Sequence, residues 1–183
     1  MRPHELFASL VDYPAPGMLG VLDDGISSML PAFSESVDLL KTFRFSVEGL
    51  GLGRLEEIYT ETFDMREELS LYLGHHLFAE DWRRSAFMAR LKERYRETGV
   101  SSGAEMPDHL SVVLRFLGSQ KPCQETKELL LACVVPAVSK VLENMQGQEN
   151  PYSAVLQALL LFLQRQDKRE SQSEEVLCSP FSS

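Results

Sequence analysis

Apolar residues recur at intervals of three and four through most of this chain, and no other feature of the sequence constrains its fold as strongly. That spacing places apolar side chains along one face of an α-helix. Nowhere is an Asn-Gly or Asp-Gly pair flanked by the alternating residues of a β-hairpin. At 183 residues the chain has the usual size of one domain. The sequence therefore predicts an all-α fold, a single-domain helical bundle of roughly eight to ten helices.

Prolines and glycines separate the predicted helices of the first half. These helices cover about 4–11, 18–30, 34–47, 55–63, 71–78 and 81–98. Ser34 is expected to be an N-cap, Asp81 caps the last of these helices, and Gly99 ends it. Apolar residues on opposite faces of that last helix predict packing on both sides. The stretch 49–53 follows a helix and lacks GxGxxG spacing, so we interpret its three glycines as a linker.

Three more helices are predicted in the second half. Pro107 suits the first position of one, with Asp108 near the positive end of its dipole. A pair follows over about 124–145 and 151–166, and the first of these should break at Pro136, near Val135, because proline has no N–H to bond four residues back. The resulting division of the chain is an all-helical domain over 1–166 and a disordered, Ser- and Glu-rich tail over 167–183.

Charge and targeting signals limit the partners and the compartment. The chain has 18 basic and 27 acidic residues, a formal charge of −9, which repels the phosphates of nucleic acid. Its N-terminus lacks the apolar run of a signal peptide, and its longest apolar stretches are too short to cross a bilayer. The three cysteines lack CxxC spacing. These features predict a cytoplasmic protein with no nucleic-acid partner and no stable membrane insertion.

Histidines offer a weak case for chemistry. His75 and His76 are adjacent, so on a helix they point about 100° apart and cannot face one metal ion together. No GxSxG or catalytic-cysteine context is present either. We therefore predict no metal site, no cofactor and no enzyme, and expect buried or hydrogen-bonded histidines. A hydrolase or nucleotide-dependent enzyme using His75, His76, Asp108 and His109 is kept as a competing hypothesis.

Charge is distributed unevenly in the middle of the chain. Between Glu56 and Asp81 there are eight acidic residues and one basic residue, Arg66. The acidic residues are Glu56, Glu57, Glu61, Asp64, Glu67, Glu68, Glu80 and Asp81. The predicted helix that follows is rich in arginine and lysine. A basic peptide could bind the acidic stretch, or both stretches could be solvated helix faces that form salt bridges with their neighbours.

Four motifs follow one another between Tyr59 and Leu117. They are Tyr59-x3-Phe63-Asp64, then Ser70-Leu71-Tyr72-Leu73-Gly74-His75-His76-Leu77-Phe78-Ala79-Glu80-Asp81 followed by Arg83, then Leu91-Lys92-x2-Tyr95 with Gly99, and Glu105-Met106-Pro107-Asp108-His109-Leu110 leading to Leu114-x-Phe116-Leu117. In this order and spacing they resemble the NarJ/TorD/DmsD family of redox-enzyme maturation chaperones, closest to its nitrate reductase assembly branch.

The resemblance implies a TorD/NarJ-like helical fold and a chaperone without catalytic activity. Its implied partner, here called the client, is the immature, cofactor-free catalytic subunit of a respiratory nitrate-reductase-like molybdoenzyme, bound at its N-terminal segment. The chaperone would assist molybdenum cofactor insertion and complex assembly, as a monomer or weak dimer. The alternative is a helical adaptor that binds a twin-arginine-type signal peptide of another exported oxidoreductase.

The expected client-binding residues come from these motifs. They are Tyr59, Phe63, Asp64, Leu71, Tyr72, His75, His76, Phe78, Glu80, Asp81, Arg83, Glu105, Pro107, Asp108, His109 and Leu110. Glu105, Asp108 and His109 lie at a loop-to-helix junction that could orient a bound segment. Asp108 could instead simply favour the helix N-terminus while His109 packs.

Overall fold

A computed structural model describes residues 2–78 and 81–177, with side chains except those of Asp81 and of 169–177. The all-α prediction is confirmed. The described helices are α1 Pro3–Leu10, α2 Met18–Met29, α3 Ser34–Ser46, α4 Leu52–Tyr59, α5 Leu73–Leu77, α6 Asp81–Thr98, α7 Leu110–Ser119, α8 Gln124–Leu129, α9 Val135–Asn144 and α10 Tyr152–Leu177. Two π-helical segments, η1 Thr60–Asp64 and η3 Leu130–Val134, and a 3-10 turn, η2 Glu67–Leu69, complete the chain.

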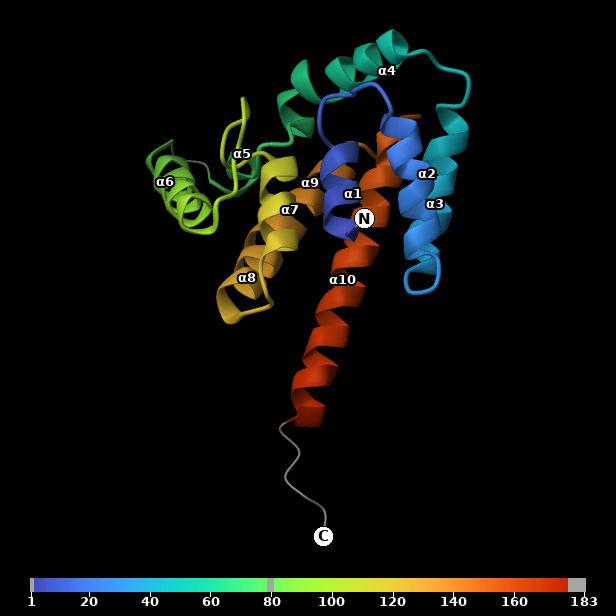
Figure 1. Cartoon of the computed structure of the whole chain (residues 1–183). Coiled ribbons are helices and arrows are strands. Elements are labelled where there is room, and N and C mark those ends of the chain that lie inside the picture. Colours follow the sequence, from blue (N-terminus) through green and yellow to red (C-terminus); the bar gives the residue numbers. More distant parts are fainter. Residues whose placement is uncertain (1, 79–80, 178–183) are drawn as a thin grey trace.

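The core forms around the first half of α10, which packs along α3 and also contacts α9 and α1 (Figure 1). Helix α1 lies in turn against α7 and α2. Phe162 of α10 is almost fully buried and stacks on Phe7 of α1 at 5.4 Å between ring centroids. Tyr152, at the start of α10, contacts Phe43 of α3 and Phe63 of η1. These aromatic contacts join elements that are distant in the sequence.

Both π-helical segments lie within stretches that the sequence predicts as single α-helices. The predicted helix 55–63 is α4 continued by η1, and the predicted helix 124–145 is α8, η3 and α9 in succession. Pro136 lies in the first turn of α9, directly after η3, where a missing N–H is tolerated. The chain stays helical through Val135, so the predicted break is a change from π-helical to α-helical hydrogen bonding. A π-helical turn places one extra residue in the helix and is frequent at functional sites.

Several predicted helix boundaries were wrong. Phe33, not Ser34, is the N-cap of α3, and Ser34 is its first helical residue. Helix α7 begins at Leu110 rather than at Pro107, because the side chain of His109 accepts the Ser111 N–H and caps the helix. Asp108 is therefore not in the first turn of a helix.

Two further boundaries differ from those predicted. Leu71 and Tyr72 lie before α5 in an extended segment, outside the predicted helix 71–78. Helix α10 continues to Leu177 instead of ending at 166. The disordered tail over 167–183 stays a prediction, and residues 178–183 lie outside the described part of the chain.

Helix α6 packs on one side only, which corrects the prediction of two buried faces. Leu91 and Tyr95 are buried, whereas Trp82 on the opposite face is 65% exposed. The helix ends at Thr98, and Gly99 follows with φ +73°, a left-handed conformation that favours glycine. The predicted end of this helix is confirmed.

Candidate functional site

The candidate site is organised by a short backbone pairing between two segments that the sequence analysis treated separately. The N–H of Leu73 donates to the carbonyl of Asp108 at 2.8 Å, and the N–H of Leu110 donates to the carbonyl of Leu71 at 2.9 Å. These bonds form an antiparallel bridge between Tyr72 and His109. Their rings consequently lie edge to face, 5.0 Å apart. The bridge joins the second and fourth motifs into one wall.

The end of α4 and the π-helical segment η1 that follows it provide the opposite wall. Tyr59 and Phe63 are buried, and their ring centroids lie 5.1 Å apart. The hydroxyl of Tyr59 donates to the carbonyl of Val11 at 3.2 Å, which ties this wall to the end of α1. Asp64, the last residue of η1, is exposed.

A third side comes from Tyr13, in the proline-rich turn after α1. Its side chain is 49% exposed, and its ring meets that of Tyr59 edge to face at 5.4 Å. The prolines of this turn predicted only the end of a helix, and Tyr13 was not among the expected client-binding residues. An aromatic residue directly before Pro14, in a turn with two prolines, was the available signal, because such a residue has little core to enter.

These three sides enclose a cavity of about 170 Å³, hereafter the cavity. It is lined by Tyr13, Tyr59, Phe63, Asp64, Leu71, Tyr72, Glu105 and His109. All except Tyr13 were among the residues expected from the motifs, so the fold brings seven of the sixteen expected residues together in space. A second, more open hollow adjoins the cavity at Tyr13 and has a volume of about 420 Å³. The other residues of this acidic hollow are Gly53, Glu56, Glu57, Thr60 and Glu61.

Tyr72 and Glu105 form a polar contact within the cavity. The Tyr72 hydroxyl donates to Glu105 Oε2 at 2.8 Å. Burial, followed by this hydrogen bond to a carboxylate, raises the pKa of Tyr72 to about 12. The phenol therefore stays protonated and keeps its hydrogen-bond donor at physiological pH.

A buried ion pair fixes the wall behind the cavity. Asp108 has no exposed surface, and its Oδ2 accepts bonds from Arg84 Nε at 3.1 Å and from the Gly74 N–H at 3.2 Å. The guanidinium of Arg84 also lies over the ring of Tyr72, 5.9 Å from its centroid. A Cβ on Gly74 would lie 2.7 Å from Asp108 Oδ2, so any larger residue there would have to displace the ion pair. Arg84 and Gly74 were not predicted as site residues, since the fold alone brings them to Asp108.

His109 is buried and acts as a structural cap. Burial is the main cause that lowers its pKa, against the opposing charges of Glu105 and Asp12. Its Nδ1 accepts the Ser111 N–H at 3.3 Å and lies 2.8 Å from the Ser111 hydroxyl. Ser111 is fully buried, so this serine and histidine cannot present a nucleophile to a substrate. The contact closes the first turn of α7.

The remaining expected residues do not line the cavity. His75 is exposed, whereas the Nε2–H of His76 donates to the Ser70 carbonyl at 2.6 Å. Burial is the main cause that lowers the pKa of His76. Phe78 packs on Phe87 of α6 at 5.4 Å.

Arg83, Pro107 and Leu110 also lie away from the cavity. The guanidinium of Arg83 lies over the exposed Trp82 ring. The Pro107 carbonyl accepts the Tyr95 hydroxyl at 2.8 Å, and Leu110 belongs to the core. Glu80 and the side chain of Asp81 lie outside the described residues.

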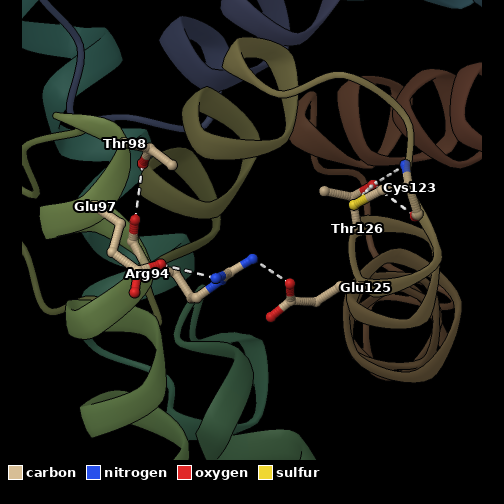
Figure 2. A network of polar contacts seen from close by, with 6 residues as sticks. All are labelled: Arg94, Glu97, Thr98, Cys123, Glu125 and Thr126. Carbon is tan, nitrogen blue, oxygen red and sulfur yellow. Dashed lines mark hydrogen bonds and ion pairs between the residues drawn. The ribbon is translucent and has the colours of Figure 1, made fainter.

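A separate groove of about 300 Å³ lies between α6 and the α8–η3 segment. It is lined by Phe87, Arg90, Leu91, Arg94, Phe116, Glu125, Glu128, Leu129, Ala132 and Cys133. Figure 2 shows Arg94 of α6 reaching Glu125 of α8 and also Glu97 of its own helix. The same view shows Cys123 and Thr126, whose hydrogen bonds close the first turn of α8. The groove is thus crossed by an ion pair of the chain itself.

Neither a metal cluster nor a membrane span is found in 2–78 and 81–177. No three His, Cys, Asp or Glu side chains gather there in a way that could hold a metal ion. Over the same residues, every helix is too short or too polar to cross a lipid bilayer.

Comparison with known proteins places the chain. No curated protein matches it. The family model of the nitrate reductase delta subunit, however, matches residues 27–169, which include α3 to α9, most of α10 and every cavity residue except Tyr13. The match covers well over half of the chain and confirms the resemblance stated from the motifs. The chain therefore belongs to the nitrate reductase delta subunit family.

Proposed function

We propose that this protein is a cytoplasmic, non-enzymatic chaperone for a respiratory nitrate-reductase-like molybdoenzyme. It binds the cofactor-free catalytic subunit and assists molybdenum cofactor insertion and assembly of the complex. The observation that carries the proposal is the cavity, where aromatic rings and carboxylates from three motifs meet beside the acidic hollow. An amphipathic client segment with basic residues fits such a surface, since its apolar face can contact the rings.

Exposed apolar residues beside the cavity support binding of a peptide rather than a small substrate. Met65 follows Asp64 in the sequence and is 74% exposed, and Met106 follows Glu105 and is 44% exposed. Methionine side chains are flexible and polarisable, and they adapt to partners of varied shape. Together with Tyr13 they provide apolar contact area beside the carboxylates.

The competing enzyme hypothesis receives little support from the geometry. Its residues do not meet, because His75 is exposed on α5 whereas Asp108 is buried in an ion pair with Arg84. Addition of nucleotide or a divalent metal should leave the melting temperature unchanged. A rise in the melting temperature would revive this hypothesis.

A pull-down with the tagged full-length protein tests the proposed function. The bait is expressed in the native host, once with normal and once with blocked molybdenum cofactor synthesis, and retained proteins are identified by mass spectrometry. We expect enrichment of a nitrate reductase catalytic subunit without its cofactor, and more of it when cofactor synthesis is blocked. Recovery of general chaperones alone would contradict the proposal.

The acidic hollow also suits a basic signal peptide, so the twin-arginine adaptor remains the second candidate. The same experiment separates the two. Capture of a precursor that still carries a twin-arginine leader and belongs to another exported oxidoreductase would favour the adaptor.

A further inference from the structure

Four carboxylates lie around the aromatic rings of the cavity: Asp12, Asp64, Glu105 and Asp108. Burial is the main cause that raises the pKa of Tyr59 and of Tyr72, and nearby carboxylates add to it: Asp64 and Glu105 for both phenols, Asp12 for Tyr59 and Asp108 for Tyr72. Each carboxylate is therefore close to at least one ring. Such a concentration of negative charge is unfavourable unless cations compensate it.

The chain compensates only two of the four. Arg115 pairs with Asp12, and Arg84 pairs with Asp108. Asp64 and Glu105 have no basic partner among the residues that the structure describes, and Glu105 accepts only the Tyr72 hydroxyl. These two are also the carboxylates that line the cavity.

The rings of the cavity complement a cation as well. Four aromatic rings line the cavity, those of Tyr13, Tyr59, Phe63 and Tyr72, and the chain's own Arg84 already lies over the ring of Tyr72. The negative π-face of such a ring attracts an ammonium or guanidinium group, and the attraction grows where water is excluded. Since one water molecule needs only roughly 15 Å³, a volume of 170 Å³ admits a larger group, such as the end of one long side chain.

We propose that the cavity is a subsite for a single cationic side chain, an arginine or lysine of the bound client segment. The inference rests on the proposed function and specifies what the segment must present. Asp64 and Glu105 receive the positive charge, the rings contact its face and its methylene stem, and the Tyr72 hydroxyl orients Glu105. An anionic group would be repelled, and an apolar group would desolvate two carboxylates without pairing them.

The test is an NMR titration of the full-length protein at low salt, with n-butylguanidinium chloride as the probe and n-butylurea as its neutral isostere. We expect saturable shifts of the ring signals of Tyr13, Tyr59 and Tyr72 with the cation, in the millimolar range, and none with the urea. Equal shifts with both compounds, or cation shifts confined to other residues, would overturn the proposal.

Variants sharpen the same test. The double variant Asp64→Asn, Glu105→Gln should weaken cation binding at least tenfold, whereas Glu125→Gln, Glu128→Gln in the other groove should leave it unchanged. Unchanged binding in the first variant would overturn the subsite. If the first variant does not fold, the comparison of the two probes on the wild-type protein still decides. Because no client is present, a failed pull-down with a positive titration would contradict the proposed function and leave the subsite standing.

Discussion

The cavity and the α6–α8 groove are two hollows of similar kind that differ in how their charges are matched. Each is lined in part by a π-helical segment, η1 in the cavity and η3 in the groove, and each combines aromatic residues with two carboxylates. In the groove, Arg94 reaches across to Glu125 (Figure 2). In the cavity, Asp64 and Glu105 meet no cation of the described chain. Acidic and aromatic content alone therefore does not distinguish a binding site from a surface where the chain's own basic residues pair with the carboxylates.

The ion pairs beside the two hollows differ in burial. Asp108 is fully buried beneath the cavity wall, whereas Arg94 and Glu125 have side-chain exposures of 41% and 57%. Water and salt screen the exposed pair, but they cannot replace the cation that a buried carboxylate loses. The cavity wall should therefore depend on its ion pair, and the groove should not.

The largest expected effect follows from removing one arginine at each place. Arg84→Gln should lower the free energy of unfolding by about 3 kcal/mol, because Asp108 stays buried with the Gly74 N–H as its remaining donor in the described structure. Arg94→Gln should cost less than about 1 kcal/mol. Urea denaturation of both variants measures the difference. Equal costs would remove the distinction between the two ion pairs.

A pH dependence should give the next largest effect. Burial lowers the pKa of His4 from 6.5 to about 4, and burial also lowers the pKa values of His76 and the cavity residue His109. Between pH 6.5 and 4 the unfolded chain binds more protons, so stability falls as the pH decreases. His4 alone should account for about 2 kcal/mol between pH 6.5 and 5. The lining of the cavity includes His109, whereas that of the groove includes no histidine, so no histidine of the groove contributes to this pH dependence.

Substitution of His4 checks this assignment. His4→Gln should flatten the plot of unfolding free energy against pH below 6.5 without abolishing its slope, since His76 and His109 still titrate. The slope is compared rather than the absolute stability, because the variant also loses the edge-to-face contact of His4 with Phe162. A slope identical to that of the wild type would contradict the assignment.

The smallest of these effects tests the close packing behind the cavity. In Gly74→Ala, the added methyl group would meet Asp108 Oδ2 at 2.7 Å and Arg84 Cγ at 2.8 Å, which should cost about 1.5 kcal/mol. Gly20→Ala is the matched control, because Gly20 lies inside α2 with no atom within 4 Å of the added methyl group. The control should stabilise by about 0.5 to 1 kcal/mol. Thermal denaturation ranks the two, and a stabilising Gly74→Ala would show that the wall can relax.

Local sequence patterns were sufficient for the fold class and much of the cavity. Periodicity predicted the helices, and Pro136 the change at α9. The client-binding residues expected from the family resemblance include every cavity residue except Tyr13. Tyr13 was missed because its place depends on how the turn after α1 packs against Tyr59. The pairing of Leu71–Leu73 with Asp108–Leu110 was also missed, since such short pairing has no periodicity to detect.

The role of Asp108 shows where local reasoning ends. As the residue after a proline and before an apolar stripe, it suited a helix N-terminus. The structure instead buries it against Gly74 and Arg84. Asp108, in the turn before α7, thus contacts Gly74 of α5 and Arg84 of α6, and only the tertiary structure reveals these contacts.

The central claim is that the client segment binds at the cavity and the adjoining acidic hollow, and not at the α6–α8 groove. Fluorescence anisotropy with a labelled peptide from the N-terminus of the nitrate reductase catalytic subunit of the same organism tests it directly. At low salt, Glu61→Lys, Asp64→Lys should weaken binding roughly tenfold or more, whereas Glu125→Lys, Glu128→Lys should change it less than about twofold. Equal losses in both variants, or an unchanged affinity in the first, would contradict the account.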